Sequence, residues 1–256
     1  MEGTLWRNVY VGWFDRMDPD GKVWDGVKTI EDVLDRLSAA EAQMTDADTP
    51  LSGWSLDPIY MDNQRVSRQD LDKVSATRPV GVLHASGHIL NVNSKALELA
   101  GLLKPGVNHP GIPLGDDGMP TGELYGPDAM TPVAGFVGYD RAMTDCDERG
   151  LLDYAKLCVR AGVTTSTDLA ARLTDESVSM MLNVTARDRF PLRVVPLRIF
   201  FGMSAEERVE YTKELKEQST DLLRLGRIKA VADGSIQGFS ARMRWPGYHN
   251  GAPNGL

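Results

Sequence analysis

The pattern that most constrains this fold is an alternation of apolar segments and helical stretches in the second half of the chain. Three strand-like segments lie at 163–167 (VTTST), 192–201 and 227–232, and stretches of a dozen residues or more with helix signals separate them. Strands at this spacing favour right-handed βαβ units, in which neighbouring strands are parallel. Nearly continuous apolar strands also indicate a sheet covered on both faces. We therefore expect three adjacent parallel strands with helices outside them.

Helix-start signals support this alternation and predict further helices in the first half. Thr29 with Asp32, and Ser204 with Glu207, have the spacing of an N-cap residue and its partner, and Ser67 is a third N-cap candidate. The expected helices run over 29–43, 68–74, the later part of 85–102, 145–161, 174–187 and 204–225.

The first half of the chain is less regular. Residues 79–84 predict a strand, and residues 105–126, with Pro, Gly and Asp-Asp-Gly, predict a β-hairpin. We expect an inserted subdomain over about 50–126 and regular βα units over about 145–240. Because a closed (β/α)8 barrel needs eight strands, three βα strands predict an α/β fold that holds part of such a barrel.

A lysine lies inside the last of the three apolar segments. Lys229 is followed by a turn that contains Asp233 and Ser235. A lysine on a buried strand is costly unless it is paired or used chemically, and residues at the C-terminal ends of barrel strands face the active site. Lys229, with Asp233 and Ser235 beyond it, is therefore a candidate site. The alternative is a lysine that snorkels from an edge strand, and the local pattern leaves both interpretations open.

Other side chains offer weaker signals. Asp168 follows an expected strand, where it either faces a site or caps the next turn. His84 and His88 are four residues apart, but they flank a strand-to-loop junction, so a single substrate-facing histidine, His88, is favoured over a metal pair. Trp54 is a further candidate substrate contact, with ordinary packing as the alternative.

The composition is that of an ordinary soluble globular protein, with 25% charged and 42% hydrophobic residues. The net charge of −8 argues against nucleic acid or an anionic membrane as a partner. No apolar run approaches a membrane span, and the N-terminus lacks the apolar core of a signal peptide. Cys146 and Cys158 are too far apart along one expected helix to form a disulfide. Reduced thiols and a cytoplasmic location are therefore expected.

The chain resembles the metal-dependent amidohydrolase superfamily in four blocks. They are SRQDLDKVSATRPVGVLHASGHILNVNSKALELAGL (67–102), DDGMPTGEL (116–124), AGVTTSTDLA (161–170) and IKAVADGSIQGFSARM (228–243). The closer likeness is to amidohydrolase family 3, which includes YtcJ-like proteins and N-substituted formamide deformylases. Each block alone is weak, but their order and spacing make the combination specific.

The resemblance implies a metal-dependent hydrolase of the (β/α)8 TIM-barrel type, with one or two divalent metal ions, zinc being the expected metal. Lys229 stands where the family has a carboxylated lysine that bridges the metals at the end of the fourth strand. Lys229 and Asp233 are then the expected catalytic residues, and Trp54, His88, Asp168 and Ser235 the expected substrate contacts. The family's His-x-His pair, its later histidines and its aspartate have no counterpart. We therefore expect a fragment without the first strand and the C-terminal half of the barrel.

Three functions remain open on this basis. The first is a hydrolase of C–N bonds in amides, formamides or cyclic amides, acting on small molecules. The second is a non-catalytic remnant or binding module without a working metal site. The third is a Schiff-base enzyme that uses Lys229 without metal, which the acidic turn disfavours. Because a partial barrel exposes sheet edges and apolar faces, we also expect a homo-oligomer or a complementing chain.

Overall fold

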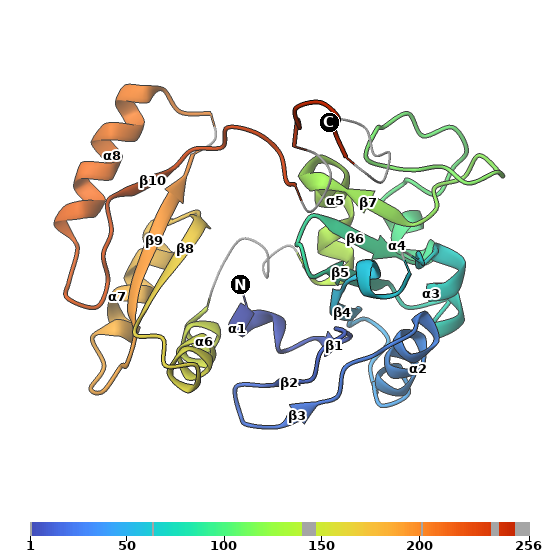
Figure 1. Cartoon of the computed structure of the whole chain (residues 1–256), viewed down its shortest axis with the longest axis horizontal. Coiled ribbons are helices and arrows are strands. Elements are labelled where there is room, and N and C mark those ends of the chain that lie inside the picture. The colour runs from blue at the N-terminus through green and yellow to red at the C-terminus, as the bar shows by residue number, and fades with distance from the viewer. Residues whose placement is uncertain (1, 63, 140–146, 201, 237–240, 249–256) are drawn as a thin grey trace. The chain divides into compact units, whose positions relative to one another are not determined.

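The computed structural model describes residues 2–62, 64–139, 147–200, 202–236 and 241–248. The chain divides into two compact units (Figure 1). Unit 1 comprises residues 1–7, 18–22 and 141–232, and unit 2 comprises residues 8–17, 23–140 and 233–256. None of the described helices is long and apolar enough to cross a membrane.

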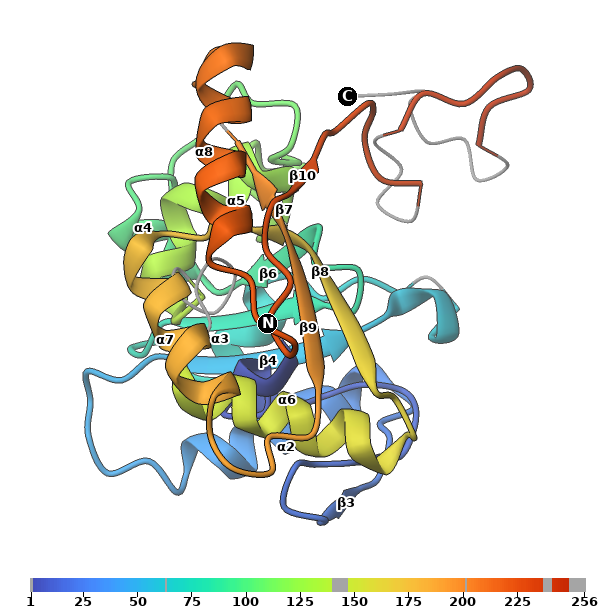
Figure 2. The same cartoon turned by 90° about the vertical axis from the view of Figure 1, so that its left-hand side faces the viewer.

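Unit 1 is built around a parallel sheet with the strand order β10-β9-β8. β8 (Thr165–Ala171) pairs with β9 (Arg193–Ile199), and β9 pairs with β10 (Arg227–Lys229), in both cases in parallel. The helices α7 (Asp175–Thr185) and α8 (Ala205–Glu217) connect these strands, and Figure 2 shows them beside the sheet. The expected strand order, direction and βαβ connectivity are confirmed.

The helices of unit 1 cover one face of this sheet. On that face Val194 of β9 joins Leu151 of α6 (Glu148–Arg160), Val178 of α7 and Leu215 of α8 in one buried cluster. The short helix α1 (Glu2–Leu5) packs against α6. Because side chains alternate along a strand, the opposite face carries other residues, which are partly or fully exposed: Thr165, Thr167, Arg193, Val195, Leu197, Ile199, Arg227 and Lys229.

Element boundaries in unit 1 differ from the expected ones in two places. β10 covers only 227–229 of the expected 227–232. α8 was expected to reach Leu225 but ends at Glu217. The Ser219 hydroxyl accepts the Leu225 N–H at 3.0 Å, and Leu223 forms an isolated parallel bridge with Val194. The chain leaves the helix early because this turn buries Leu223 and Leu225 in the core.

The described residues of unit 2 form a five-stranded sheet with the order β1-β4-β5-β6-β7. β1 (Val9–Tyr10), β4 (Leu51–Leu56) and β5 (Val80–His84) are parallel. β6 (Ile89–Val92) and β7 (Glu123–Tyr125) continue the sheet in antiparallel fashion. A separate hairpin pairs β2 (Arg16–Met17) with β3 (Val23–Trp24).

Helices pack on both faces of the unit 2 sheet. α2 (Ile30–Glu41) and α3 (Arg68–Val74) share a buried cluster with β4 and β5 on one face. α4 (Ser94–Leu99), α5 (Gly126–Ala134) and the 3-10 turn η2 (Gly135–Val137) lie against the other. The approach there is so close that a Cβ on Gly81 would lie 2.7 Å from Val137 Cβ. Helices therefore cover both faces of this sheet.

Of the strands of unit 2, β1 to β4 and β6 were not predicted from the sequence. β4 lies in the stretch 46–66, where Ser52, Gly53 and Ser55 hide the apolar pattern. β6 lies in 85–102, where a loop was expected to lead into a helix. The expected strand at 79–84 is confirmed, but the hairpin at 105–126 is reduced to the bridge Leu114–Pro120, and β7 pairs with β6 instead. Parallel βα connections thus also occur before residue 145.

The helix-start signals are confirmed. Capping boxes join Thr29 with Asp32, Ser67 with Asp70, and Ser204 with Glu207. Each side-chain oxygen accepts an N–H that would otherwise have no partner at the helix end. The 3-10 turn η1 (Pro58–Tyr60) likewise begins at a capping Asp57.

Candidate functional site

Lys229 ends β10 at the carboxyl edge of the unit 1 sheet. Its cross-strand partner is Ile199, so it lies on the face opposite Val194 and the helices. Lys229 is partly buried, and it forms no ion pair within the described part of unit 1. Its strand-end position agrees with the expectation, and its role as a site residue stays a prediction.

Asp168 lies inside β8 rather than at its end, so this part of the prediction is wrong. Its cross-strand partner is Pro196, so it lies on the opposite face of the sheet from Lys229. The pairing register shifts between Asp168 and Ala171. Its Oδ1 accepts the Ala170 N–H at 3.0 Å. The carboxylate therefore stabilises an irregular strand, close to the turn-capping alternative, and its contact with a substrate stays a prediction.

Asp233 and Ser235 belong to unit 2 and have local backbone partners. Asp233 Oδ1 accepts the Gly234 N–H at 2.7 Å, and its Oδ2 accepts the Arg242 N–H at 2.9 Å. The Ser235 carbonyl accepts the Ala241 N–H at 3.1 Å. The bonds to Arg242 and Ala241 join the two ends of the loop that contains Asp233 and Ser235. Residues 237–240 of this loop lie outside the described part of the chain.

Trp54 lies on β4 and is 4% exposed. The Tyr10 ring meets it edge-on with centroids 5.3 Å apart, and the Arg16 guanidinium lies 5.6 Å from its ring centre. The next residue, Ser55, has a φ of +77°, a strained value for a residue with a side chain. Trp54 is thus a packed ring beside a strained turn, and its role as a substrate contact stays a prediction.

The two neighbouring histidines lie in different environments. His84 ends β5 and is buried, with Nε2 2.5 Å from Asn91 Oδ1. Burial above all, together with the Arg65 charge, lowers the pKa of His84 to about 4 against the opposing Asn91 bond. His88 is exposed in the turn between β5 and β6, where its N–H donates to Ser86 Oγ at 3.2 Å. His88 thus lies in the turn after the strand, as expected, and its contact with a substrate stays a prediction.

A buried polar network beside His84 was missed from the sequence. Asn91 donates from Nδ2 to the Val66 carbonyl at 2.6 Å. Its cross-strand neighbour Glu123 accepts from the Tyr125 hydroxyl at 2.8 Å and from Arg65 Nη1 at 3.3 Å. Burial first, then the Glu123 charge, raises the pKa of Tyr125. The available signal was a single polar residue inside each short apolar strand.

The described residues do not by themselves make a metal centre. No group of three or more His, Cys, Asp or Glu side chains among them is arranged to hold an ion. Zinc sites use three or four protein ligands. Lys229 as one ligand of such a site therefore stays a prediction.

Comparisons with known proteins show which family and which solved structures the chain is similar to. The sequence model described as the amidohydrolase family matches residues 17–252. No curated protein matches the chain. An uncharacterized metal-dependent hydrolase from Pyrococcus horikoshii OT3 superposes with a TM-score of 0.51 at 14% identity, covering 94% of this chain and 42% of that one. A similarly described protein from Pyrococcus furiosus gives 0.48 at 16% identity, covering 94% and 43%.

The chain therefore spans less than half the length of these two solved structures. At 14% identity, the likeness to the Pyrococcus horikoshii protein concerns the fold alone. The family match is of a different kind, because it covers most of the sequence and includes every residue of the four blocks described above. The chain belongs to the amidohydrolase family.

Proposed function

We propose that this chain is part of a metal-dependent hydrolase that cleaves C–N bonds in amides, formamides or cyclic amides. The observation that carries the proposal is the position of Lys229, at the carboxyl end of a parallel strand and on the face that the helices leave open. Family membership supports it. The likeness to a longer metal-dependent hydrolase supports the fold on which it depends.

The proposal assigns β8, β9 and β10 to the second, third and fourth strands of a (β/α)8 barrel. Their order and parallel direction are those of consecutive barrel strands. The remaining strands belong, in this proposal, to a longer protein of which the chain spans part, and residues from about 50 to 126 form a subdomain inserted into it.

In the longer protein Lys229 acts as a metal ligand after its neutral amine has added carbon dioxide. The nitrogen attacks the carbon of CO2, and one proton leaves to solvent, which gives a carbamate anion with two oxygens. A divalent ion, zinc in our proposal, would lower the pKa of a bound water when present. Asp233 and Ser235 shape the turn beyond the lysine, while Trp54, His88 and Asp168 contact a small-molecule substrate.

In the present chain the single lysine does not provide a complete set of ligands. We therefore expect an unmodified Lys229, weak metal binding and no hydrolase activity from it alone. The exposed face of the unit 1 sheet also favours association with a second copy or a complementing chain. The proposed compartment is the cytoplasm.

The test is hydrolysis of a panel of amides, formamides and cyclic amides by the full-length protein. Lys229→Ala should abolish turnover and lower the bound metal, and short carboxylic acids should restore part of the rate by replacing the carbamate. Lys213→Ala, at an exposed lysine that pairs with Glu210 on α8, serves as the matched control and should behave as the parent does. Normal turnover and metal content in the Lys229 variant would disprove the assignment.

One observation favours a second candidate, a binding module without catalysis. Among the described residues, no three metal-ligating side chains come together. A full-length protein that binds no divalent metal, and that hydrolyses none of the panel, would support this candidate over the hydrolase.

A further inference from the structure

The open face of the unit 1 sheet combines apolar and positively charged side chains. Its apolar part comes from three residues of β9: Val195, Leu197 and Ile199. Three cations also belong to it: Arg193, Arg227 and Lys229. No Asp or Glu is among the described residues of this face. The face is therefore complementary to a surface that is apolar and negatively charged.

Arg227 is the cation of this face that has neither a partner nor a proposed role. Arg193 donates from Nε to the Asp221 carbonyl at 3.0 Å and from Nη1 to Thr165 Oγ1 at 3.2 Å. Lys229 is the proposed metal ligand. The Arg227 side chain forms no ion pair or hydrogen bond with any residue that the structure describes. Its cross-strand neighbour is Leu197, and Lys229 adds a like charge two residues further along β10.

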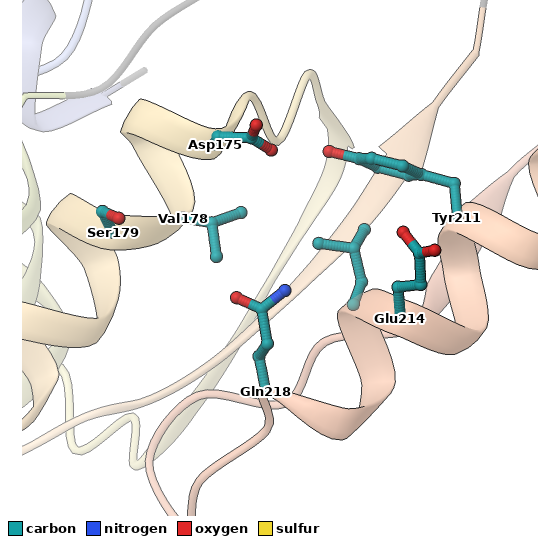
Figure 3. A pocket seen from close by; sticks show the side chains of 7 residues that line it. Asp175, Val178, Ser179, Tyr211, Glu214 and Gln218 are labelled. Atoms are coloured by element: carbon teal, nitrogen blue, oxygen red, sulfur yellow. The ribbon is translucent and has the colours of Figure 1, made fainter.

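The acidic side chains of the neighbouring helices do not neutralise Arg227. Asp175 of α7 and Glu214 of α8 line a pocket on the helix-covered side of the sheet (Figure 3). Val194 faces these helices, whereas Arg227 and its neighbour Leu197 belong to the opposite alternation. The sheet therefore separates the two carboxylates from Arg227.

Any segment that covers the open face buries Arg227. Parallel sheets normally have both faces covered, and an arginine keeps its charge when it is buried. Burial of an unpaired guanidinium is strongly unfavourable, so charged groups inside proteins are almost always paired. A stable cover of this face therefore has to bring a carboxylate to Arg227.

We propose that a further segment of a longer protein covers the open face and pairs a carboxylate with Arg227. Its apolar side chains would rest on Val195, Leu197 and Ile199. The chain matches less than half of the Pyrococcus horikoshii hydrolase, so a protein of that length has further segments for this role. A segment of the same polypeptide meets the face at a high effective concentration, which favours it over a second copy. The inference rests on the proposed barrel assignment and adds to it the charge that the cover must carry.

Thiol labelling with iodoacetamide tests whether the face is covered. Leu197→Cys places a thiol on the face, and peptide mass spectrometry separates it from Cys146 and Cys158. The thiol should react about tenfold or more slowly in the full-length protein than in the isolated 256-residue chain, where Leu197 is partly exposed.

Arg227→Met tests the carboxylate. In the full-length protein it leaves a buried carboxylate without its partner, so the midpoint of thermal unfolding at neutral pH should fall by about 5 °C or more. This difference should shrink as the pH falls, because protonation removes the charge of the unpaired carboxyl group. Unit 1 contains no histidine that would titrate in the same range. Arg227→Lys keeps the charge and should restore most of the midpoint, and in the isolated chain Arg227→Met should have almost no effect.

The matched control is Arg224→Met, because Arg224 lies outside the open face and pairs with Asp221 at 3.3 Å. It should leave the midpoint of both proteins unchanged. If the Leu197→Cys thiol is protected in the full-length protein but Arg227→Met is harmless there, the cover lacks the carboxylate, and this inference fails while the barrel assignment stands. Equally fast labelling in both proteins would overturn both. Concentration-dependent protection in the isolated chain would make a second copy the occupant and would also overturn the proposal.

Discussion

The two sheets of this protein differ in how they are covered. Every residue of β5 and β6 in unit 2 is buried, and helices lie on both faces. In β8 of unit 1 five residues are exposed and two are partly buried, and the helices cover one face. Parallel sheets normally have both faces covered. The open face of unit 1, which carries Lys229, is therefore the place where chemistry or a further chain segment is to be expected.

The largest effect is predicted for Asn93, which joins three elements of unit 2. Its Oδ1 accepts the N–H groups of Val80 and Ala96, and its Nδ2 donates to the carbonyls of Ser75 and Arg78. Asn93→Ala should lower the free energy of unfolding of unit 2 by roughly 3–6 kcal/mol, since it leaves four buried groups without partners. Hydrogen exchange of the β5 amides measures this loss.

The control for this prediction is Asn183→Ala on the exposed side of α7. It should leave stability nearly unchanged, because the side chain is solvated and alanine favours helix. If Asn93→Ala and Asn183→Ala lowered the free energy of unfolding equally, the predicted difference between unit 2 and unit 1 would be contradicted.

Two leucines, one in each sheet, test the difference in how the two sheets are covered. Leu83 on β5 is 1% exposed, whereas Leu197 on β9 lies on the open face and is partly exposed. Leu83→Ala should cost about 2–5 kcal/mol through lost burial and a cavity, and Leu197→Ala about 1 kcal/mol or less. Chemical denaturation followed separately in each unit measures both. A larger loss for Leu197 would mean that a further part of the protein covers that face.

The sequence was most informative where one local rule decides the structure. The capping boxes at Thr29 and Ser204 are visible in the residue spacing, and the βαβ rhythm predicted the unit 1 sheet in order and direction. β4 was missed because Ser52, Gly53 and Ser55 interrupt its apolar pattern, although the strand shares a buried cluster with α2 and α3. The link between His84 and Asn91 was missed for another reason, since strand register decides which polar residues meet.

The candidate site was less predictable than the fold. Periodicity placed Lys229 on the last strand and the family resemblance placed it at the end of that strand, but Asp168 was misplaced because β8 continues past it to Ala171. Irregularities of this kind depend on bonds such as that from the Ala170 N–H to the Asp168 carboxylate, which the residue pattern does not predict.

A pH-dependent loss of stability is predicted for unit 2. The pKa of His84 falls from about 6.5 in the unfolded chain to about 4 in the fold, so folding favours the neutral ring. Its contribution is complete above about pH 6.5 and is lost as the pH falls through about 4, a change of roughly 3 kcal/mol. Denaturation at a series of pH values should show a shallower acid slope for His84→Gln. His88→Gln, in the exposed turn, should keep the parent slope.

The smallest effects are predicted at the helix caps. Thr29→Ala and Ser204→Ala each remove one capping bond and should cost about 1 kcal/mol. The loss at Thr29 should spread through unit 2, because α2 buries Val33 and Leu37, whereas the loss at Ser204 should be confined to α8, which buries only Leu215 among its described residues. Amide exchange along the two helices measures the spread, and a reversed pattern would contradict the comparison.

The most direct test of Lys229 as a metal-bridging residue is carbon nuclear magnetic resonance of the full-length protein equilibrated with isotopically labelled bicarbonate and a divalent metal. We predict a carbamate resonance that disappears in Lys229→Ala and persists in Lys213→Ala. A full-length protein that hydrolyses C–N bonds without this resonance, or one that retains it in the Lys229 variant, would contradict the account.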